Sequence, residues 1–260
     1  MILCIDVGNT NIKYAVFDGN ELKASFRVSS RHSRTADEYG ATLLNLLASK
    51  DIKTQDIKGI IMSSVIPSLN YTISHMCEYF FGITPMVVGA GIKTGLNIKA
   101  DNPKEVGADI IANCVGAFKK YGDDKPMIVI DFGTATTFDV LTGLGELIGV
   151  VIAPGMKSSL ESLVSNTAQL PMIELQAPKT AIPKNTKTAM QAGIIFGFAG
   201  LVENIVKKIK QQLGVDDISV TATGGMGEII AKEVSCITRI DRLLTLQGLK
   251  YLYELNNENR

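Results

Sequence analysis

Hydrophobic positions along the chain follow two spacings. Short apolar runs rich in β-branched residues predict buried strands at Gly59–Val65, Leu147–Ile152 and Ile218–Thr221. Apolar residues at helical spacing predict helices over Tyr39–Ala48, Asn70–Phe80, Lys104–Lys120, Lys157–Asn166, Thr188–Leu213, Gly227–Glu233 and Leu244–Asn256. Because strands and helices alternate, we expect an α/β fold.

One pattern occurs twice, half a chain apart. Leu3–Asn11 and Ile128–Thr136 each run from an apolar stretch into an Asp, one further residue, a Gly and then hydroxyl or amide side chains. The two aspartates, Asp6 and Asp131, are 125 residues apart. This repeat predicts two related halves, each starting with a strand that leads into a tight turn.

A second apolar run and a second turn follow each copy, so each half is predicted to open with a β-hairpin. The runs are Ile12–Phe17 before Asp18-Gly19 and Thr137–Leu141 before Thr142-Gly143. The helix break at Tyr121–Lys125 predicts a domain boundary there, with domains of residues 1–121 and 122–260. No linker rich in Pro, Gly and Ser separates them, so we expect the halves to pack directly on each other.

Charge and hydropathy argue against several classes of protein. The 26 Lys and Arg balance 26 Asp and Glu without any run of like charge, which argues against a nucleic-acid partner. The longest apolar stretches, around Leu147–Ala153 and Gly193–Val202, are too short or too broken by Gly to span a bilayer. Met1–Asp6 lacks the features of a secretory signal, so we expect a cytoplasmic protein with no membrane contact.

The cysteine and histidine content narrows the chemistry. The chain has two histidines and four widely separated cysteines with no C-x-x-C: Cys4, Cys77, Cys114 and Cys236. This argues against a zinc ribbon, a disulfide framework, a histidine-rich metal site and a Ser-His-Asp triad. We therefore expect chemistry based on carboxylates, hydroxyls and backbone amides.

The repeated turns are candidate phosphate-binding loops. Each has a carboxylate at a strand end, a glycine where the backbone approaches a ligand, and then hydrogen-bond donors. Two such loops facing each other across a cleft would hold a polyphosphate from both sides, while an Asp holds a divalent cation. The alternative is that each Asp-x-Gly is only a hairpin turn and that Lys13 is only a surface lysine.

Asp109 is the candidate general base. Asn102, Pro103 and Glu105 predict a helix start with Asn as N-cap and Pro at N1, so that Asp109 lies in the second turn. Its apolar neighbours would partly desolvate the carboxylate, which favours a role as a base. The alternative is an exposed aspartate on the helix surface.

Glycines recur in the apolar segment Met190–Val202. Gly193, Gly197 and Gly200 would let another helix approach closely, which predicts a buried packing face. The alternative is a helix that the glycines merely weaken.

These motifs resemble those of a known family. Duplicated Asp-x-Gly hairpins are typical of the actin, hexokinase and sugar-kinase superfamily of ATP-binding proteins, and within it the chain closely resembles the type III pantothenate kinases. The resemblance covers Asp6–Asn11, Thr35–Tyr39, Ser63–Pro67, Asp101–Pro103, Gly107–Asp109, Asp131–Thr137, Ile152–Gly155, Asn185-Thr186, Thr223–Gly225 and Leu244–Leu249. It implies duplicated ribonuclease H-like (actin-like ATPase) domains with a cleft between them, and phosphorylation of pantothenate by ATP at the first step of coenzyme A synthesis.

The resemblance also implies a role for each matching residue. Asp6 would hold Mg²⁺, Asp131 a monovalent cation such as K⁺ or NH₄⁺, and Asp109 would take the proton from the substrate's primary hydroxyl. ATP would contact Thr134 and the first loop, Asp6, Val7, Gly8, Asn9, Thr10, Asn11, Ile12 and Lys13. Gly107, Ala108, Asp109 and Ile110 would border pantothenate, and Thr186 would reach the substrate of the neighbouring subunit in a homodimer whose interface includes the glycine-rich helix face. The alternatives are that Asp131 only forms a turn and that Thr186 only caps a helix.

Three positions depart from the family pattern. Ala100 stands where an aromatic residue, usually Tyr, packs on pantothenate, Ile110 replaces an Arg, and Val150 replaces a Gly near the nucleotide. Two of the three lie at the acceptor site. Two other functions therefore stay open: a kinase of another small alcohol, and a regulatory protein that binds nucleotide with weak or no kinase activity.

Overall fold

The computed structural model describes residues 1–257. Its internal contacts divide the chain into two compact units. The first unit contains Met1–Leu96, Ala100–Tyr121 and the C-terminal segment that begins at Leu243, and the second contains Asn97–Lys99 and Gly122–Arg242. One segment of the first unit ends at Tyr121, and the C-terminal helix belongs to this unit and not to the one that contains residue 122.

The first unit is built on a five-stranded sheet with the order β3-β2-β1-β4-β5. Its strands are β1 (Ile2–Val7), β2 (Asn11–Asp18), β3 (Glu21–Ser29), β4 (Gly59–Ser64) and β5 (Met86–Val87). The central strand β1 pairs antiparallel with β2 and parallel with β4. Both β1 and β4 are buried along nearly their whole length, as expected of strands that are covered on both faces.

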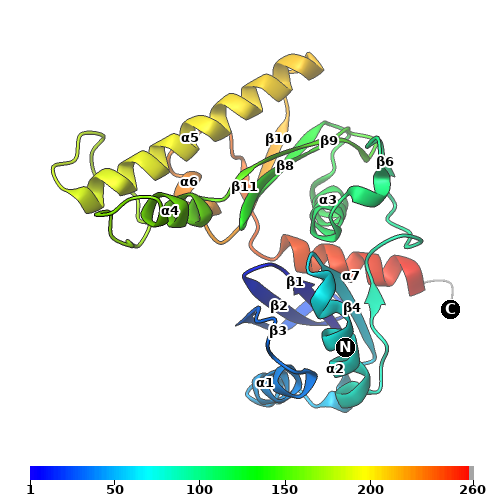
Figure 1. The fold of residues 1–260 in the computed structure, drawn as a ribbon. Coiled ribbons are helices and arrows are strands. Elements are labelled where there is room, and N and C mark those ends of the chain that lie inside the picture. Colours follow the sequence, from blue (N-terminus) through cyan, green and yellow to red (C-terminus); the bar gives the residue numbers. More distant parts are fainter. Residues whose placement is uncertain (258–260) are drawn as a thin grey trace. The chain divides into compact units, whose positions relative to one another are not determined.

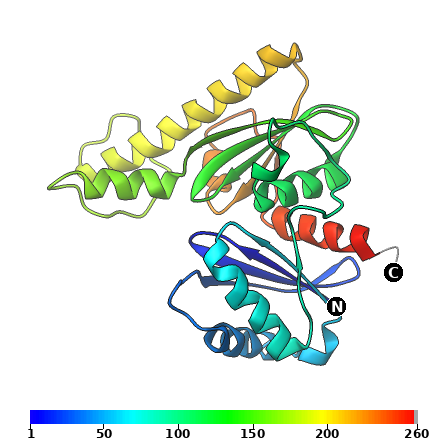
Figure 2. The ribbon, with the colours of Figure 1, turned by 45° about the vertical axis from the view of Figure 1, so that its right-hand side comes forward.

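Helices cover both faces of this sheet (Figures 1 and 2). Helices α1 (Ala36–Ala48) and α2 (Pro67–Phe81) pack against each other on one face, and α7 (Leu244–Asn257) contacts β1, β2 and β4 on the other. Helix α3 (Ala108–Tyr121) packs on α7.

Helices α3 and α7 cross at two glycines. A Cβ atom on Gly248 would lie 1.8 Å from the Ala112 carbonyl oxygen, and one on Gly116 would lie 2.6 Å from the Leu244 carbonyl oxygen. Beside the crossing, the buried Thr245 hydroxyl donates a 2.7 Å hydrogen bond to Asn113 Oδ1. This backbone-to-backbone approach explains why α7 belongs with the first unit.

The second unit contains a six-stranded sheet with the order β11-β10-β7-β8-β9-β6. Its strands are β6 (Asn97–Ile98), β7 (Met127–Phe132), β8 (Ala135–Leu141), β9 (Glu146–Pro154), β10 (Ser219–Gly224) and β11 (Arg239–Ile240). Its helices are α4 (Met156–Ser165), α5 (Thr186–Leu213) and α6 (Gly227–Ile230). The long helix α5 runs along this sheet with α4 beside it (Figure 1), and its buried side chains form one core with those of β7 and β10.

The two sheets repeat one arrangement of strands. In each, the first strand pairs antiparallel with the second and parallel with the fourth, so β7, β8, β10 and β11 correspond to β1, β2, β4 and β5. Asp6 on β1 and Asp131 on β7 hold equivalent positions, opposite Lys13 and Thr137 respectively. The predicted α/β fold of duplicated ribonuclease H-like units is confirmed.

Local structure differs from the sequence prediction near Asp109. Asn102 accepts a hydrogen bond from the Lys104 N–H, but the helix that it caps is a short 3-10 helix, Pro103–Glu105. Val106 then adopts an extended backbone, which ends this helix, and α3 begins at Ala108. Asp109 therefore lies in the first turn of α3 and not in the second turn of a helix that starts at Asn102.

Two further differences concern β3 and α6. The sequence pattern does not predict β3, because this strand at the sheet edge exposes most of its residues and lacks an apolar run. Helix α6 ends at Ile230, before the predicted end at Glu233.

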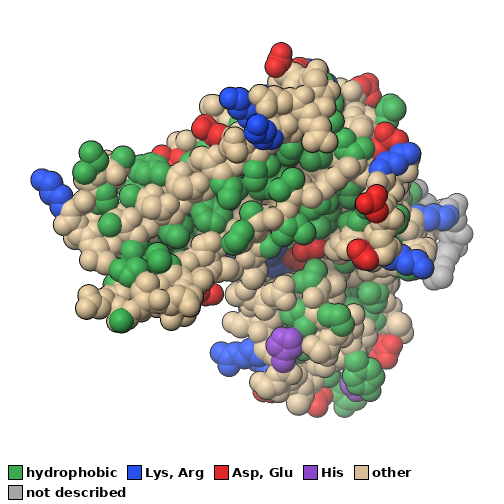
Figure 3. Space-filling view, turned by 45° about the horizontal axis from the view of Figure 1, so that its top comes forward, with side chains coloured by type: hydrophobic (Ala, Val, Ile, Leu, Met, Phe, Trp, Pro, Cys, Tyr) green, Lys and Arg blue, Asp and Glu red, His purple; other side chains and the backbone are tan. Residues whose placement is uncertain are grey.

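Among the described residues, α5 is the one helix long and apolar enough to cross a membrane. Half of its most apolar window is buried, and Ile195 and Val202 lie in the core of the second unit, so α5 is a core helix. On its other side Gly193, Gly197 and Gly200 are exposed, with open space where a Cβ would be. Figure 3 shows hydrophobic side chains on this surface, so the predicted packing face is uncovered in the single chain.

Candidate active site

The carboxylate of Asp6 is held at the end of β1. Asp6 is 4% exposed, Ser63 Oγ donates a 2.9 Å hydrogen bond to its Oδ1, and Lys13 Nζ lies 3.0 Å from its Oδ2. The strand register explains this cluster, because Ser63 on β4 and Lys13 on β2 are both directly opposite Asp6. The sheet thus fixes a carboxylate, paired with a cation, just before the turn that follows β1.

The turn Gly8–Thr10 joins β1 to β2. The Gly8 N–H donates to the Asn11 carbonyl oxygen at 3.1 Å, and a Cβ on Gly8 would lie equally close to that oxygen, at 3.1 Å. Asn9 and Thr10 at the tip are exposed. The residues predicted to contact ATP in the first half therefore form one continuous hairpin beside the Asp6 carboxylate.

Asp109 is half-buried in the first turn of α3. Its Oδ1 accepts a 2.9 Å hydrogen bond from the Ile110 N–H. A Cβ on residue 107 would lie 2.6 Å from the same Oδ1, so a side chain there would displace the carboxylate. The Asp109 carboxylate is thereby held in one position in this turn, where it can accept a proton.

Asp131 of the second unit packs closely against a glycine, Gly224. A Cβ on Gly224 would lie 2.6 Å from Asp131 Oδ1, and Gly224 has a φ of +88°, which disfavours any side chain there. The same Cβ would lie 2.6 Å from the Phe132 carbonyl oxygen, so Gly224 packs directly against the end of β7 that carries Asp131.

The exposed turn that contains Thr134 is attached to α4. The Thr134 carbonyl accepts hydrogen bonds from the Gly155 N–H at 3.0 Å and from Ser158 Oγ at 2.8 Å. A Cβ on Gly155 would lie 2.3 Å from this carbonyl oxygen, so the approach depends on glycine. The Thr134 side chain is thereby held close to the N-terminal end of α4.

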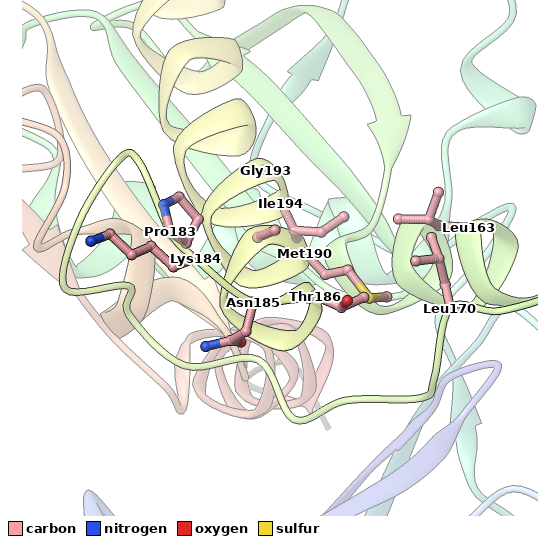
Figure 4. A pocket seen from close by; sticks show the side chains of 10 residues that line it. Leu163, Leu170, Pro183, Lys184, Asn185, Thr186, Met190, Gly193 and Ile194 are labelled. Atoms are coloured by element: carbon pink, nitrogen blue, oxygen red, sulfur yellow. The ribbon is translucent and has the colours of Figure 1, made fainter.

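Thr186 lies at the start of α5, at a cavity of about 620 Å³ (Figure 4). The lining is largely apolar and includes Leu163, Leu170 and Met190. Lys184, which precedes the first residue of α5, also lines the cavity. Asn185 caps the helix, since its Oδ1 accepts a 3.0 Å hydrogen bond from the Thr188 N–H. The alternative that Thr186 serves as the N-cap is therefore wrong.

A sequence model of the family described as type III pantothenate kinase matches residues 2–208. The chain belongs to this family. The match spans both repeated hairpins and includes Asp109 and Thr186, so the kinase assignment rests on both units.

Solved structures share the fold of this type III pantothenate kinase family member. A Campylobacter jejuni protein, provisionally named a conserved Baf family transcriptional activator, has a TM-score of 0.62 at 19% identity, over 99% of this chain and 100% of that chain. A provisionally named 2-dehydro-3-deoxygalactonokinase from Sinorhizobium meliloti has a TM-score of 0.63 at 12% identity, over 98% of this chain and 96% of that chain. At such identities the likeness shows the fold alone, which is the fold of sugar kinases.

The three departures from the family pattern occupy partly or fully buried positions. Ile110 is 9% exposed, and Ala100 and Val150 are half-buried. A guanidinium at position 110 would have to leave this site or lose its hydration, which costs free energy. The first unit is therefore built around an apolar residue next to Asp109 in this member of the pantothenate kinase family.

Neither aspartate site of this kinase forms a complete metal cage. Among residues 1–257, no group of three or more His, Cys, Asp or Glu could hold a metal ion. The Lys13 ammonium on Asp6 Oδ2 nevertheless shows that this carboxylate accepts a cation. A single carboxylate is enough for Mg²⁺ at such a site, because in kinases the ion keeps water and phosphate oxygens as its other ligands.

Sequence reasoning missed the side chains that hold this kinase's loops. Ser63 belongs to a motif of the family resemblance, but its contact with Asp6 follows only from the parallel pairing of β4 with β1. Ser30, whose hydroxyl donates to the Gly8 carbonyl, lies in a segment without any motif. No local signal marks either contact, because both join positions far apart in the sequence.

Proposed function

We propose that the chain transfers the γ-phosphoryl group of ATP to pantothenate and forms 4′-phosphopantothenate, the first step of coenzyme A synthesis. The observation that carries this proposal is the Asp109 carboxylate, fixed by the Ile110 N–H and by the absence of a side chain at Gly107. It stands in a chain whose family is that of the type III pantothenate kinases.

In this proposal ATP binds at the two repeated hairpins. Residues from Asp6 to Lys13 contact the phosphates, with the Lys13 ammonium as a positive charge and the backbone of the Gly8–Thr10 turn as a source of N–H donors. Thr134 provides a second contact. The support is the geometry of each hairpin, since Gly8 and Gly155 keep side chains away from the turns.

Asp6 would hold Mg²⁺, and Asp131 would hold a monovalent cation such as K⁺ or NH₄⁺. Bound cations supply charge neutralisation for the phosphate oxygens. Ser63 keeps the Asp6 carboxylate oriented, because it donates to one oxygen and leaves the other toward the Lys13 side.

Asp109 accepts the proton of the primary hydroxyl of pantothenate. As the hydroxyl oxygen bonds to the γ-phosphorus in line with the bond that breaks, ADP leaves and the proton ends on Asp109. Gly107, Ala108 and Ile110 border the acceptor. Thr186 contributes to the acceptor site of a neighbouring subunit in a homodimer that pairs through the exposed glycine face of α5, and the enzyme acts in the cytoplasm.

The proposal is tested by the turnover of purified enzyme with ATP, Mg²⁺ and pantothenate, with and without K⁺. Asp109→Asn should keep the fold and the ATP affinity but lower kcat by roughly 10²–10⁴, the usual contribution of a positioned base. Asp37→Asn is the matched control, because Asp37 also lies in the first turn of a helix, α1, and is exposed. An Asp109→Asn enzyme within twofold of the wild-type rate would remove Asp109 from the mechanism.

The buried Ile110 favours a second candidate, a kinase of another small alcohol. An apolar residue at this position offers no charge to an anionic acceptor. A panel of small primary alcohols with and without a carboxylate separates the two candidates. A kcat/KM higher for a neutral alcohol than for pantothenate would favour the second.

A further inference from the structure

The segment between β3 and α1 contacts the first hairpin loop through Ser30. We call Ser30–Arg34 the strap. Ser30 Oγ donates a 2.5 Å hydrogen bond to the Gly8 carbonyl oxygen, and the Ser30 N–H donates to the Thr10 carbonyl oxygen at 3.0 Å. One residue of the strap therefore fixes the carbonyl groups on both sides of Asn9.

The strap is anchored to the hydrophobic core. The side chain of Tyr39 is fully buried, and its hydroxyl accepts a hydrogen bond from the Arg31 N–H at 2.9 Å and donates one to the Arg31 carbonyl oxygen at 3.0 Å. His32 Nδ1 lies 3.1 Å from Ser68 Oγ in the first turn of α2. Arg31, the residue next to Ser30, is thus held in place by a tyrosine of the hydrophobic core.

The strap is also fixed at its C-terminal end. Thr35 caps α1, and its side chain and backbone exchange hydrogen bonds with Glu38 in a capping box. The Arg34 guanidinium lies over the Tyr39 ring, 5.8 Å from its centroid. Because the residues that follow Ser30 are held in this way, the strap has a fixed position in the first unit from which Ser30 contacts the loop.

We propose that Ser30 is a positioning residue for the nucleotide, acting through the Gly8–Thr10 turn. Carbonyl oxygens repel phosphate, whereas successive N–H groups attract it. By engaging the Gly8 and Thr10 carbonyl oxygens, Ser30 keeps them from turning toward the phosphates. With the Gly8 N–H bonded to the Asn11 carbonyl, these contacts select one conformation of the turn. This inference rests on the proposed function, since it requires nucleotide to bind at this hairpin.

The test compares the binding of ATP with Mg²⁺ to four chains by calorimetry: wild type, Ser30→Ala, Ser30→Thr and Ser25→Ala. Ser30→Ala should raise the Kd for ATP about threefold to tenfold, the effect of one hydrogen bond. Ser30→Thr retains the hydroxyl and should restore most of the affinity. Ser25 is exposed on the same strand that leads to the strap, so Ser25→Ala should bind ATP as the wild type does.

Two further measurements separate positioning from general damage. In steady-state assays Ser30→Ala should raise the KM for ATP while the KM for the alcohol substrate stays unchanged. Tyr39→Phe removes the hydroxyl that fixes Arg31 and should weaken ATP binding in the same direction. Thermal denaturation of each variant shows whether it is folded at the assay temperature.

Wild-type ATP affinity in Ser30→Ala, an equal loss in Ser25→Ala, or failure of Ser30→Thr to recover affinity would each overturn the role of Ser30. If the wild type phosphorylates pantothenate in any of these cases, the proposed function stands without the strap. If the wild type binds no ATP at all, the proposed function fails, and this inference fails with it.

Discussion

Replacing Gly248 with alanine measures how closely α3 and α7 pack. The new Cβ would lie 1.8 Å from the Ala112 carbonyl oxygen and 3.1 Å from the Gly116 nitrogen, both of them backbone atoms. A carbon and a carbonyl oxygen in contact are about 3.3 Å apart, so the two helices would have to separate locally by about 1.5 Å. No side-chain rotation can relieve this clash.

The expected loss of stability combines two terms of opposite sign. Overpacking between well-packed elements costs about 1–3 kcal/mol, and a clash between backbones belongs at the upper end. Alanine in place of glycine within a helix returns up to about 1 kcal/mol. We therefore expect Gly248→Ala to lose about 2 kcal/mol, a decrease in Tm of about 4–8 °C for a chain of this size.

Matched glycine variants test whether the change in Tm follows the space around each glycine. Gly116→Ala should lower Tm less than Gly248→Ala does, because its Cβ would lie 2.6 Å from a carbonyl oxygen. In the monomeric chain Gly200→Ala on α5 should raise Tm, because nothing lies within 4 Å of the new Cβ, whereas in a dimer that pairs through this face the Cβ would meet the partner. Thermal denaturation of the three variants in one buffer, in the same oligomeric state, gives the order. A Gly248→Ala chain at least as stable as the wild type would refute the close crossing.

Three further outcomes are expected. In Gly224→Ala the new Cβ would lie 2.6 Å from Asp131 Oδ1, so it should displace this carboxylate and remove the activation by K⁺ while ATP binding is retained, and an unchanged K⁺ titration would contradict the role of Asp131. Burial raises the pKa of the Cys77 thiol from 9.0 to about 12. Above pH 9 the folded state therefore keeps this proton while unfolded chains lose it. The free energy of unfolding, measured in urea, should decrease as pH rises from about 9 toward 12, by up to about 1.4 kcal/mol per pH unit. Equal stability at about pH 8 and about pH 10 would count against this. Ala100→Tyr combined with Ile110→Arg should lower the KM for pantothenate more than it changes kcat, and the buried guanidinium should lower Tm. A wild-type KM already near the lower limit of about 1 μM seen for enzymes would contradict this.

The duplicated hairpins could be predicted because their signal is local. Each strand, turn and second strand lies within about twenty consecutive residues, and the repeat itself identifies Asp6 and Asp131 as equivalent. The pairing of β1 with β2 and of β7 with β8 follows directly from such a pattern. The relation of both hairpins to β4 and β10 depends on crossover connections, which leave no local pattern.

The start of α3 shows how a correct local signal can mislead. Asn102 and Pro103 do start a helix, but it stops after three residues, and the helix that carries Asp109 begins separately at Ala108. The sequence shows where a helix can begin and not how far the surrounding structure lets it continue. The roles of Ser30 and Ser63 could not be predicted, because each contact depends on which strands lie side by side.

The position of α7 has a consequence for how the protein is made. Helix α7 is synthesised after the whole second unit. Its residues Leu249 and Leu252 are nevertheless fully buried, and the helix covers β1, β2 and β4 of the first unit. The sheet translated first therefore keeps one apolar face uncovered until synthesis has passed Asn257, while the second unit can already fold. A nascent chain that stalls before Leu244 would leave this face exposed, so the first unit can complete its fold only after the second unit has been synthesised.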